Sequence, residues 1–232
     1  MVDVDVQTQD RWRRLDRITG IAGVAATVLL FTPIIAISTL GEPGFDGSRA
    51  EAAEFFSAGD TSWVTTAEAT AAVGMLAFLW FVACLTTRLR GSEGEPAWRS
   101  TVALGSGVLV AAYGVIDASW EAAFNRGSEL EPAIAVFAFD LGNLGFANAW
   151  VALGSFAIAA GWAILAGRAL AAWWAWWAIV AGAGLLVVRF FWEGWAWTAP
   201  YFLFWVWVIA LAIRLLARRV PAPAPNDLRA QQ

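Results

Sequence analysis

The sequence predicts an all-α integral membrane protein, a helical bundle of six transmembrane helices with both termini in the cytoplasm. Three observations predict this class. Of the 232 residues, 59% are hydrophobic and only 15% are charged, whereas soluble domains carry about a quarter charged residues. Six apolar runs are each long enough to cross a hydrocarbon core of about 30 Å. The arginines are concentrated at alternate ends of these runs, and such an excess marks the cytoplasmic side.

The first span is expected over residues 18–40, after a polar, arginine-rich cytoplasmic tail over residues 1–17. Pro33 is expected to kink this helix. A cleaved signal peptide is the rival interpretation, because the sequence AIS at 36–38 resembles a small-residue cleavage site. The run is longer than the apolar region of a signal peptide, about 7–15 residues, and this length favours a transmembrane span.

The loop after the first span is acidic and carries a signal for a short helix. Ser48 and Glu51 form an S-x-x-E capping box, which is typical of a helix N-terminus. A helix is therefore expected over residues 49–57. We expect Phe55 and Phe56 to rest this helix on the membrane surface.

The remaining five spans are expected over residues 63–87, 100–122, 143–167, 171–192 and 199–217. The fourth apolar region, 133–167, exceeds one ordinary span. Its first part is either a surface turn or an extension of the same helix above the membrane. Residues 218–232 are rich in proline and polar, a composition typical of a disordered tail, here cytoplasmic.

Absent residue types exclude several kinds of site. The chain has no histidine and no lysine, and its single cysteine is Cys84. A retinal Schiff base needs lysine, and His-ligated haem, His-ligated zinc and Ser–His catalysis need histidine. We therefore expect no cofactor and no metal. The sequence also has no basic patch, so nucleic acid is not an expected partner.

Polar residues of four predicted spans fall at one depth, near the outer surface of the membrane. The candidate ligand-binding residues are Glu68, Asp117, Glu121, Asp140, Asn143, Arg189 and Glu193, with Trp120 and Trp192 as aromatic walls. Asp117 and Glu121 are four residues apart, a spacing that puts them on one helical face. Two partners remain open for Arg189: Glu193 one turn on, or Asp117 or Asp140 on another helix.

A second amide is expected to have a different role. Asn148 lies about 140° around the helix from Asn143, because the α-helical period is 3.6 residues. It therefore cannot share a face with Asn143. We expect Asn148 to make a hydrogen bond between helices.

Three stretches carry a family resemblance: FDGSRAEAAEFF from Phe45, FLWF from Phe78 and FDLGNLGFANA from Phe139. In these the chain resembles a group of actinobacterial multi-pass membrane proteins that is classed only as a domain of unknown function. The resemblance covers roughly residues 18–190. It implies a six-helix membrane fold and no particular chemistry.

Three classes of function remain open. The first is binding or transport of a small molecule or cation in an outward-facing polar pocket. The second is an intramembrane acid-catalysed enzyme of terpene-cyclase type, since buried acids donate protons and aromatic faces stabilise cations. SWEAAF and WEGW resemble the acid-bearing helices of such cyclases, which usually have seven spans. The third is a structural or accessory subunit, which predicts locally paired polar groups and no cavity.

The expected surroundings of the protein follow from the same reasoning. The lipid bilayer is the first partner, and the bacterial plasma membrane is the expected location. A small-molecule or cation ligand is the second partner. Small residues on the predicted spans suit close helix packing, and a homo-oligomer is left open.

Overall fold

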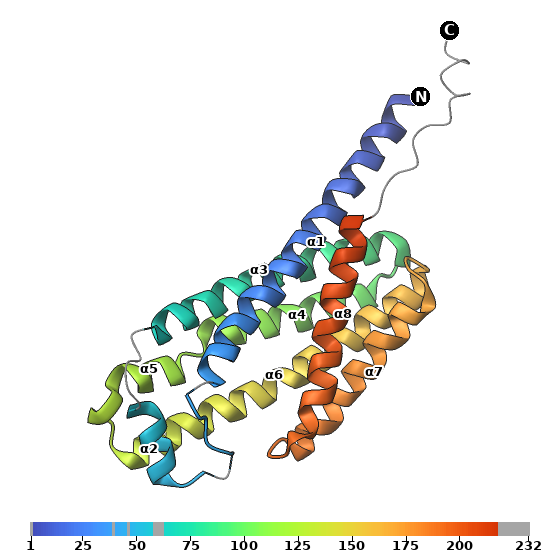
Figure 1. The fold of residues 1–232 in the computed structure, drawn as a ribbon. Coiled ribbons are helices and arrows are strands. Elements are labelled where there is room, and N and C mark those ends of the chain that lie inside the picture. The colour runs from blue at the N-terminus through green and yellow to red at the C-terminus, as the bar shows by residue number, and fades with distance from the viewer. Residues whose placement is uncertain (1, 39, 46, 58–62, 218–232) are drawn as a thin grey trace.

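The computed structural model describes residues 2–38, 40–45, 47–57 and 63–217. Its elements are α1 (Val2–Ser38), α2 (Arg49–Ser57), α3 (Val64–Glu93), α4 (Trp98–Ile116), α5 (Ser119–Arg126), η1 (Gly127–Glu129), α6 (Pro132–Gly167), α7 (Ala172–Val188), η2 (Arg189–Phe191), η3 (Trp195–Trp197) and α8 (Thr198–Ala217). No strand occurs in these residues. The predicted all-α class is confirmed (Figure 1).

Six helical stretches within the described residues are long and apolar enough to cross a membrane. They are Gln7–Ile35, Val64–Glu93, Trp98–Glu129, Pro132–Gly167, Ala172–Phe191 and Trp195–Ala217. The chain is therefore a multi-pass membrane protein whose apolar helices contact lipid. The predicted tail at 218–232 lies outside the described residues.

Helix α1 is longer than the first predicted span. It has 37 residues, or about 56 Å at a rise of 1.5 Å per residue. The polar residues 2–17 continue this helix, because neither glycine nor proline interrupts the sequence before Gly20. The first turns of α1 project beyond the rest of the bundle (Figure 1).

Helix α6 occupies the centre of the bundle. It runs without a break over 36 residues, so the segment before residue 143 is an extension of the same helix rather than a surface turn. It packs against α3, α4 and α7 along its length, and against α2 and α5 near its start. Gly154 of α6 and Gly182 of α7 face each other so closely that a Cβ on either would lie within 2.8 Å of the partner's carbonyl oxygen. Small residues thus let the two helices approach.

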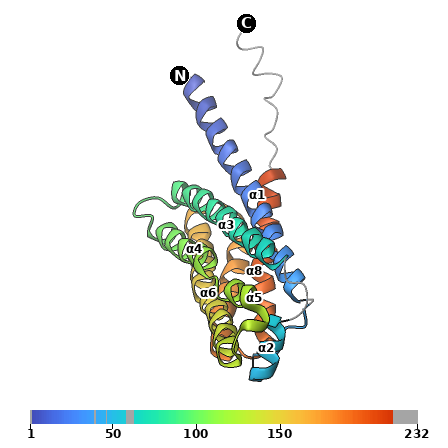
Figure 2. The ribbon, with the colours of Figure 1, turned by 90° about the vertical axis from the view of Figure 1, so that its left-hand side faces the viewer.

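The bundle has two distinct ends. We call the end with the start of α1 and the finish of α8 the terminal end (Figure 1). The opposite end carries α2 and α5, which lie together there in Figure 2, and we call it the cap end. A small separate core fills the cap end, consisting of Ala52, Phe55, Phe56, Val64, Ala123, Phe124, Ala135 and Phe139.

The cap corrects one expectation about α2. The helix forms over the predicted residues, and its capping box is present: the Ser48 N–H donates to Glu51 Oε2 at 2.6 Å, and the Glu51 N–H donates to Ser48 Oγ at 3.3 Å. Phe55 and Phe56, however, do not rest on a membrane surface. Both are buried against aromatic rings of α5 and α6, because burial among rings removes more apolar area from water than contact with an interface.

Candidate functional site

The third predicted span is broken where its carboxylates begin. Helix α4 ends at Ile116, and Asp117 has an extended backbone with φ −70° and ψ 115°. Helix α5 then starts at Ser119. The prediction that Asp117 and Glu121 share one helical face is therefore wrong. Aspartate side chains bind nearby backbone groups in non-helical conformations, and Asp117 does so here.

The Asp117 carboxylate accepts three hydrogen bonds across this break. The Tyr113 hydroxyl donates to Oδ2 at 2.5 Å. The Ser119 N–H and hydroxyl donate to Oδ1 at 3.2 and 2.9 Å. Asp117 thus connects the last turn of α4 to the first turn of α5, and both of its oxygens are used as acceptors.

Two glycines of α6 make room for this corner. A Cβ on Gly145 would lie 2.6 Å from the Tyr113 hydroxyl oxygen. A Cβ on Gly142 would overlap the Trp120 indole and lie 3.1 Å from Ser119 Oγ. Because neither glycine has a side chain, Tyr113 and Trp120 lie directly against α6. The glycines that interrupt the fourth apolar region are therefore needed for this contact.

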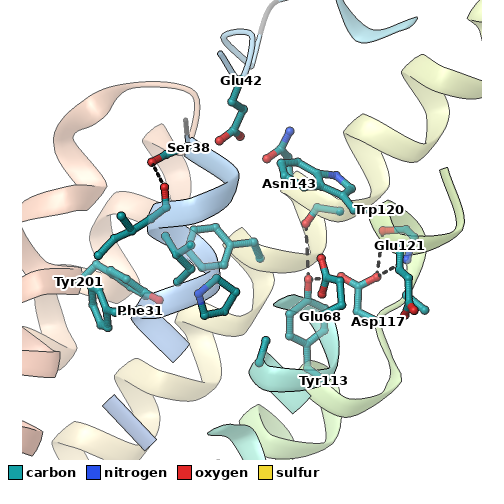
Figure 3. Close-up of a pocket in the computed structure, with 18 of the residues that line it drawn as sticks. Phe31, Ser38, Glu42, Glu68, Tyr113, Asp117, Trp120, Glu121, Asn143 and Tyr201 are labelled. Carbon is teal, nitrogen blue, oxygen red and sulfur yellow. Dashed lines mark hydrogen bonds between the residues drawn. The ribbon is translucent and has the colours of Figure 1, made fainter. Parts of the chain in front are cut away.

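A cavity of about 570 Å³ opens beside the corner, near the cap end. Its lining comes from five spans and from the loop between α1 and α2 (Figure 3). Four carboxylates line it: Glu42, Glu68, Asp117 and Glu121. Its aromatic lining residues are Phe31, Phe45, Tyr113, Trp120, Phe146, Trp197, Tyr201 and Phe202. No arginine is found among the described residues that line it.

The structure brings together five of the nine predicted site residues. Glu68, Asp117, Trp120, Glu121 and Asn143 all line the cavity. In Figure 3 the Glu68 carboxylate lies beside Tyr113 and Asp117, and it is close enough to Asp117 and Glu121 for charge repulsion. These residues come from α3, α5, α6 and the α4–α5 break. The sequence predicts that they lie at one depth in the membrane.

The other four predicted residues do not line the cavity. Asp140 and Asn143 are three residues apart on α6, a spacing that leaves them about 60° from alignment around the helix axis. Asn143 is 5% exposed, whereas Asp140 lies on the exposed side of α6. Glu193 is exposed in the turn after η2. Trp192 packs on Phe45, with ring centroids 5.1 Å apart. It therefore contacts a residue that lines the cavity without lining the cavity itself.

Arg189 takes neither of the partners considered for it. Its Nε and Nη2 donate to Asn148 Oδ1 at 3.0 and 2.7 Å. No ion pair with Glu193, Asp117 or Asp140 is found among the described residues. The predicted role of Asn148 in a hydrogen bond between helices is confirmed. Arg189 is half-buried at the junction of α7 and η2, where α6 lies alongside.

Sequence reasoning missed several lining residues. Glu42 lies in a loop, and no spacing in the sequence connects it to the spans. Tyr113 had a usable signal, because it precedes Asp117 by four residues. Phe31, Phe146, Trp197 and Tyr201 are apolar residues of apolar helices, so nothing in the sequence distinguishes them from core residues.

Two carboxyl groups near the cap end have pKa values shifted in opposite directions, for different reasons. Glu42 as a residue is exposed, but its carboxylate points into the cavity (Figure 3). Partial loss of water there raises the pKa of Glu42 above its usual value. Glu51, outside the cavity, shows the opposite: hydrogen bonds from the Ser48 N–H and hydroxyl lower the pKa of its carboxyl.

Two of the residues that line the cavity each have a buried N–H group without a hydrogen-bond partner in the described part of the chain. Asn143 is buried, and its Nδ2 finds no hydrogen-bond partner among the described residues. The indole Nε1 of Trp120, also in the lining, is buried and unpartnered in the same sense. A buried donor without an acceptor costs about 1–3 kcal/mol. A bound acceptor atom would remove that cost.

The carboxylates of the described residues do not form a metal site. No group of three Asp, Glu or Cys side chains in this part of the chain comes together closely enough to hold a metal ion. The cavity, at about 570 Å³, is also larger than a metal ion needs. The arrangement suits a larger ligand.

Comparison with known proteins adds no assignment. No family model matches the chain. No curated protein and no solved structure match it either. The function therefore has to be inferred from the cavity itself.

Proposed function

We propose that this protein binds an organic cation, an amine or quaternary ammonium with an apolar body, in the cavity at its cap end. The observation that carries the proposal is the lining: four carboxylates, a large aromatic surface and no arginine among the described residues. Carboxylates in a partly apolar site need protons or a cation to balance their charge. Aromatic faces attract cations through their quadrupoles. An organic cation would balance the charge of the carboxylates and would also be attracted by the aromatic rings.

The size and spacing of the acids favour an organic cation over a metal ion. Ca²⁺ takes about six to eight oxygen ligands at roughly 2.3–2.6 Å, and Mg²⁺ takes about six at roughly 2.0–2.1 Å. The described residues offer no such cluster. A cavity of about 570 Å³ lies in the range of small-molecule sites, about 300–1,000 Å³.

The charge of the two ends supports an orientation with the cap end outside. The terminal end carries Arg11, Arg13, Arg14, Arg17, Arg88, Arg90, Arg99, Arg168 and Arg214, and the cap end carries Arg49, Arg126 and Arg189. Arginine excess marks the cytoplasm. In a bacterial plasma membrane the cavity then opens toward the outer surface, with both termini inside.

The cap end is also strongly acidic. Its described carboxylates are Glu42, Glu51, Glu54, Glu68, Asp117, Glu121, Glu129, Glu131, Asp140 and Glu193. A surface with such an excess raises the local concentration of cations and speeds their encounter with the cavity. This negative charge at the cap end is consistent with binding and uptake of a cation from the outer side of the membrane.

An intramembrane cyclase is the second candidate, favoured by the combination of acids with aromatic walls. Such an enzyme needs a carboxylic acid with an O–H directed at the substrate. Both oxygens of Asp117 act as acceptors from Tyr113 and Ser119. That geometry favours a charged partner for cations over a proton donor, and it places the cyclase second.

The test is equilibrium binding of hexyltrimethylammonium to purified protein in lipid nanodiscs, with hexanesulfonate as the anionic counterpart. Saturable binding of the cation alone is expected. Glu68 makes no hydrogen bond within the described residues, so Glu68→Gln removes charge without disturbing the corner. This change should weaken binding about tenfold or more, because it removes the coulombic attraction between the carboxylate and the ammonium, about 4 kcal/mol for unit charges roughly 4 Å apart at an effective dielectric constant near 20.

The matched control is Glu129→Gln. Glu129 is an exposed carboxylate of η1 at the same end of the molecule, but it does not line this cavity. Equal effects of the two variants, or equal binding of the anion and the cation, would contradict the proposal. Incubation with isoprenoid diphosphates, followed by product analysis, tests the cyclase.

A further inference from the structure

We infer that the ligand is a membrane amphiphile that enters the cavity from the lipid, between α1 and α8. Its hydrocarbon chain remains between these two helices. Its cationic head lies among the carboxylates and carries a hydrogen-bond acceptor close to the nitrogen. This inference rests on the proposed function, because it assumes that the cavity takes a cation. It adds the class of ligand and its route.

The lining of the cavity is divided into a polar and an apolar side. The carboxylates and Asn143 come from α3, the α4–α5 corner, α6 and the loop after α1. Helices α1 and α8 contribute Phe31, Ile34, Tyr201 and Phe202, among others. A ligand that fills both sides is therefore charged at one end and apolar at the other.

Helices α1 and α8 separate as they approach the cavity. Near the terminal end they touch: a Cβ on Gly20 would lie 2.8 Å from the Ala212 carbonyl oxygen. Further along, the Phe31 ring fills the space between the helices, 5.7 Å from the Phe202 ring and 5.9 Å from the Trp205 ring. Phe31 itself lines the cavity, together with Pro33, Ile34 and Ile35 on the next turn of α1 (Figure 3).

The rim of this opening is accessible from outside the protein. Ile34, Ile35 and Phe202 line the cavity, and they are 42%, 61% and 51% exposed. Ile34 and Ile35 lie in the first membrane-spanning stretch and Phe202 in the last. Lipid therefore surrounds an apolar rim, and a hydrocarbon chain can pass it without entering water.

The head group must do more than carry a positive charge. The Nδ2 of the buried Asn143 amide has no acceptor among the described residues, and Asn143 lines the cavity. In Figure 3 Asn143 lies beside Trp120, and its amide faces the Glu42 carboxylate. An ester, phosphate or hydroxyl oxygen next to the ammonium group supplies the missing acceptor.

The first experiment compares three radiolabelled cations in nanodiscs: tetramethylammonium, pentadecyltrimethylammonium and lauroylcholine. The last two have chains of equal length, but lauroylcholine has an ester near its ammonium group. We expect both long-chain probes to bind in a manner that Glu68→Gln weakens. Tetramethylammonium should not compete with them at a hundredfold higher concentration.

Lauroylcholine should bind roughly three- to tenfold more tightly than pentadecyltrimethylammonium, the effect of one hydrogen bond. Asn143→Leu keeps the size of the side chain and removes the donor. This variant should abolish the difference between the two long-chain probes. A difference that survives Asn143→Leu would overturn the assignment of the head group.

The route is tested by narrowing the rim. Ile35→Trp should slow the association of lauroylcholine about tenfold. Ile21→Trp makes the same change at a residue of α1 that is 54% exposed but does not line the cavity, and it should leave the rate unchanged. Equal rates in the two variants would overturn the lateral route.

The outcomes separate this inference from the proposed function. Tetramethylammonium could instead bind as tightly as the long-chain probes and lose the same affinity in Glu68→Gln. That result would mean that the cation enters from water, so the inference would fail and the proposed function would stand. Failure of every cation to bind, hexyltrimethylammonium included, overturns both.

Discussion

The Tyr113 hydroxyl donates a 2.5 Å hydrogen bond to the Asp117 carboxylate across the break between α4 and α5. The two residues are four apart in the sequence, yet only Tyr113 is in the helix. The bond fixes the direction of the chain as it leaves α4, and it positions the carboxylate at the edge of the cavity. Removing the donor tests this role directly.

Tyr113→Phe should lower the stability of the protein by about 1.5–3 kcal/mol, since it removes a hydrogen bond to a charged group. Ser119→Ala removes another donor to the same carboxylate and should act in the same direction. Both changes are measured as thermal unfolding in nanodiscs. In an Asp117→Asn background the two effects should shrink, as a double-mutant cycle requires for residues that act through one group. Undiminished effects would mean that neither residue acts through Asp117.

The turn between α3 and α4 depends on a buried carboxylate, Glu93, whose side chain is 1% exposed. Glu93 accepts hydrogen bonds from the Arg99 N–H and guanidinium, both at 3.1 Å, and from the Ser100 N–H and hydroxyl at 3.0 and 2.6 Å. Glu93→Ala should destabilise the protein by about 1.5–3 kcal/mol, because it removes the hydrogen bonds that this charged group accepts.

The nearby Glu95 provides a matched control for Glu93. Its side chain is 79% exposed and lies 3.7 Å from Arg90. Exposed ion pairs contribute about 0–1 kcal/mol, so Glu95→Ala should change the thermal unfolding temperature very little. Similar losses in both variants would show that the turn does not depend on burial of Glu93.

The capping box of α2 predicts a pH dependence confined to the cap. Hydrogen bonds from Ser48 lower the pKa of Glu51 in the folded protein. A lowered pKa stabilises the fold above the unfolded value, about 4.3 for glutamate, and this contribution is lost as the pH falls through the folded pKa. Hydrogen exchange over residues 49–57 should therefore rise as the pH drops below about 4, after correction for the intrinsic rate.

Glu51→Gln should remove that pH dependence. Glu54→Gln, at an exposed position of the same helix, should retain it. If the wild type and Glu51→Gln respond identically to acid, the capping box does not couple α2 to pH.

The orientation in the membrane is tested with reporter fusions. Reporters placed after Arg90 and after Gly167 should both give a cytoplasmic signal, because these sites lie at the arginine-rich terminal end. A periplasmic signal at either site would reverse or break the proposed topology, and the cavity would then open on another side.

The sequence by itself determined the features that depend on local or one-dimensional information. Apolar length fixes which segments can span a membrane. The capping box at Ser48 and Glu51 depends on groups three residues apart, so it was predictable and is present. The Asn148 hydrogen bond was also predictable, since helical phase alone separates Asn148 from Asn143.

The tertiary structure decided which polar groups meet. A rotation of about 60° on one helix puts Asn143 in the cavity and leaves Asp140 outside it. Arg189 binds the amide of Asn148 rather than a carboxylate, because the partner within reach depends on how α6 and α7 pack. Glu42 reaches the cavity from a loop that no periodicity describes. Depth in the membrane can be read from a sequence, but direction around each helix axis and the course of a loop are set by packing between helices.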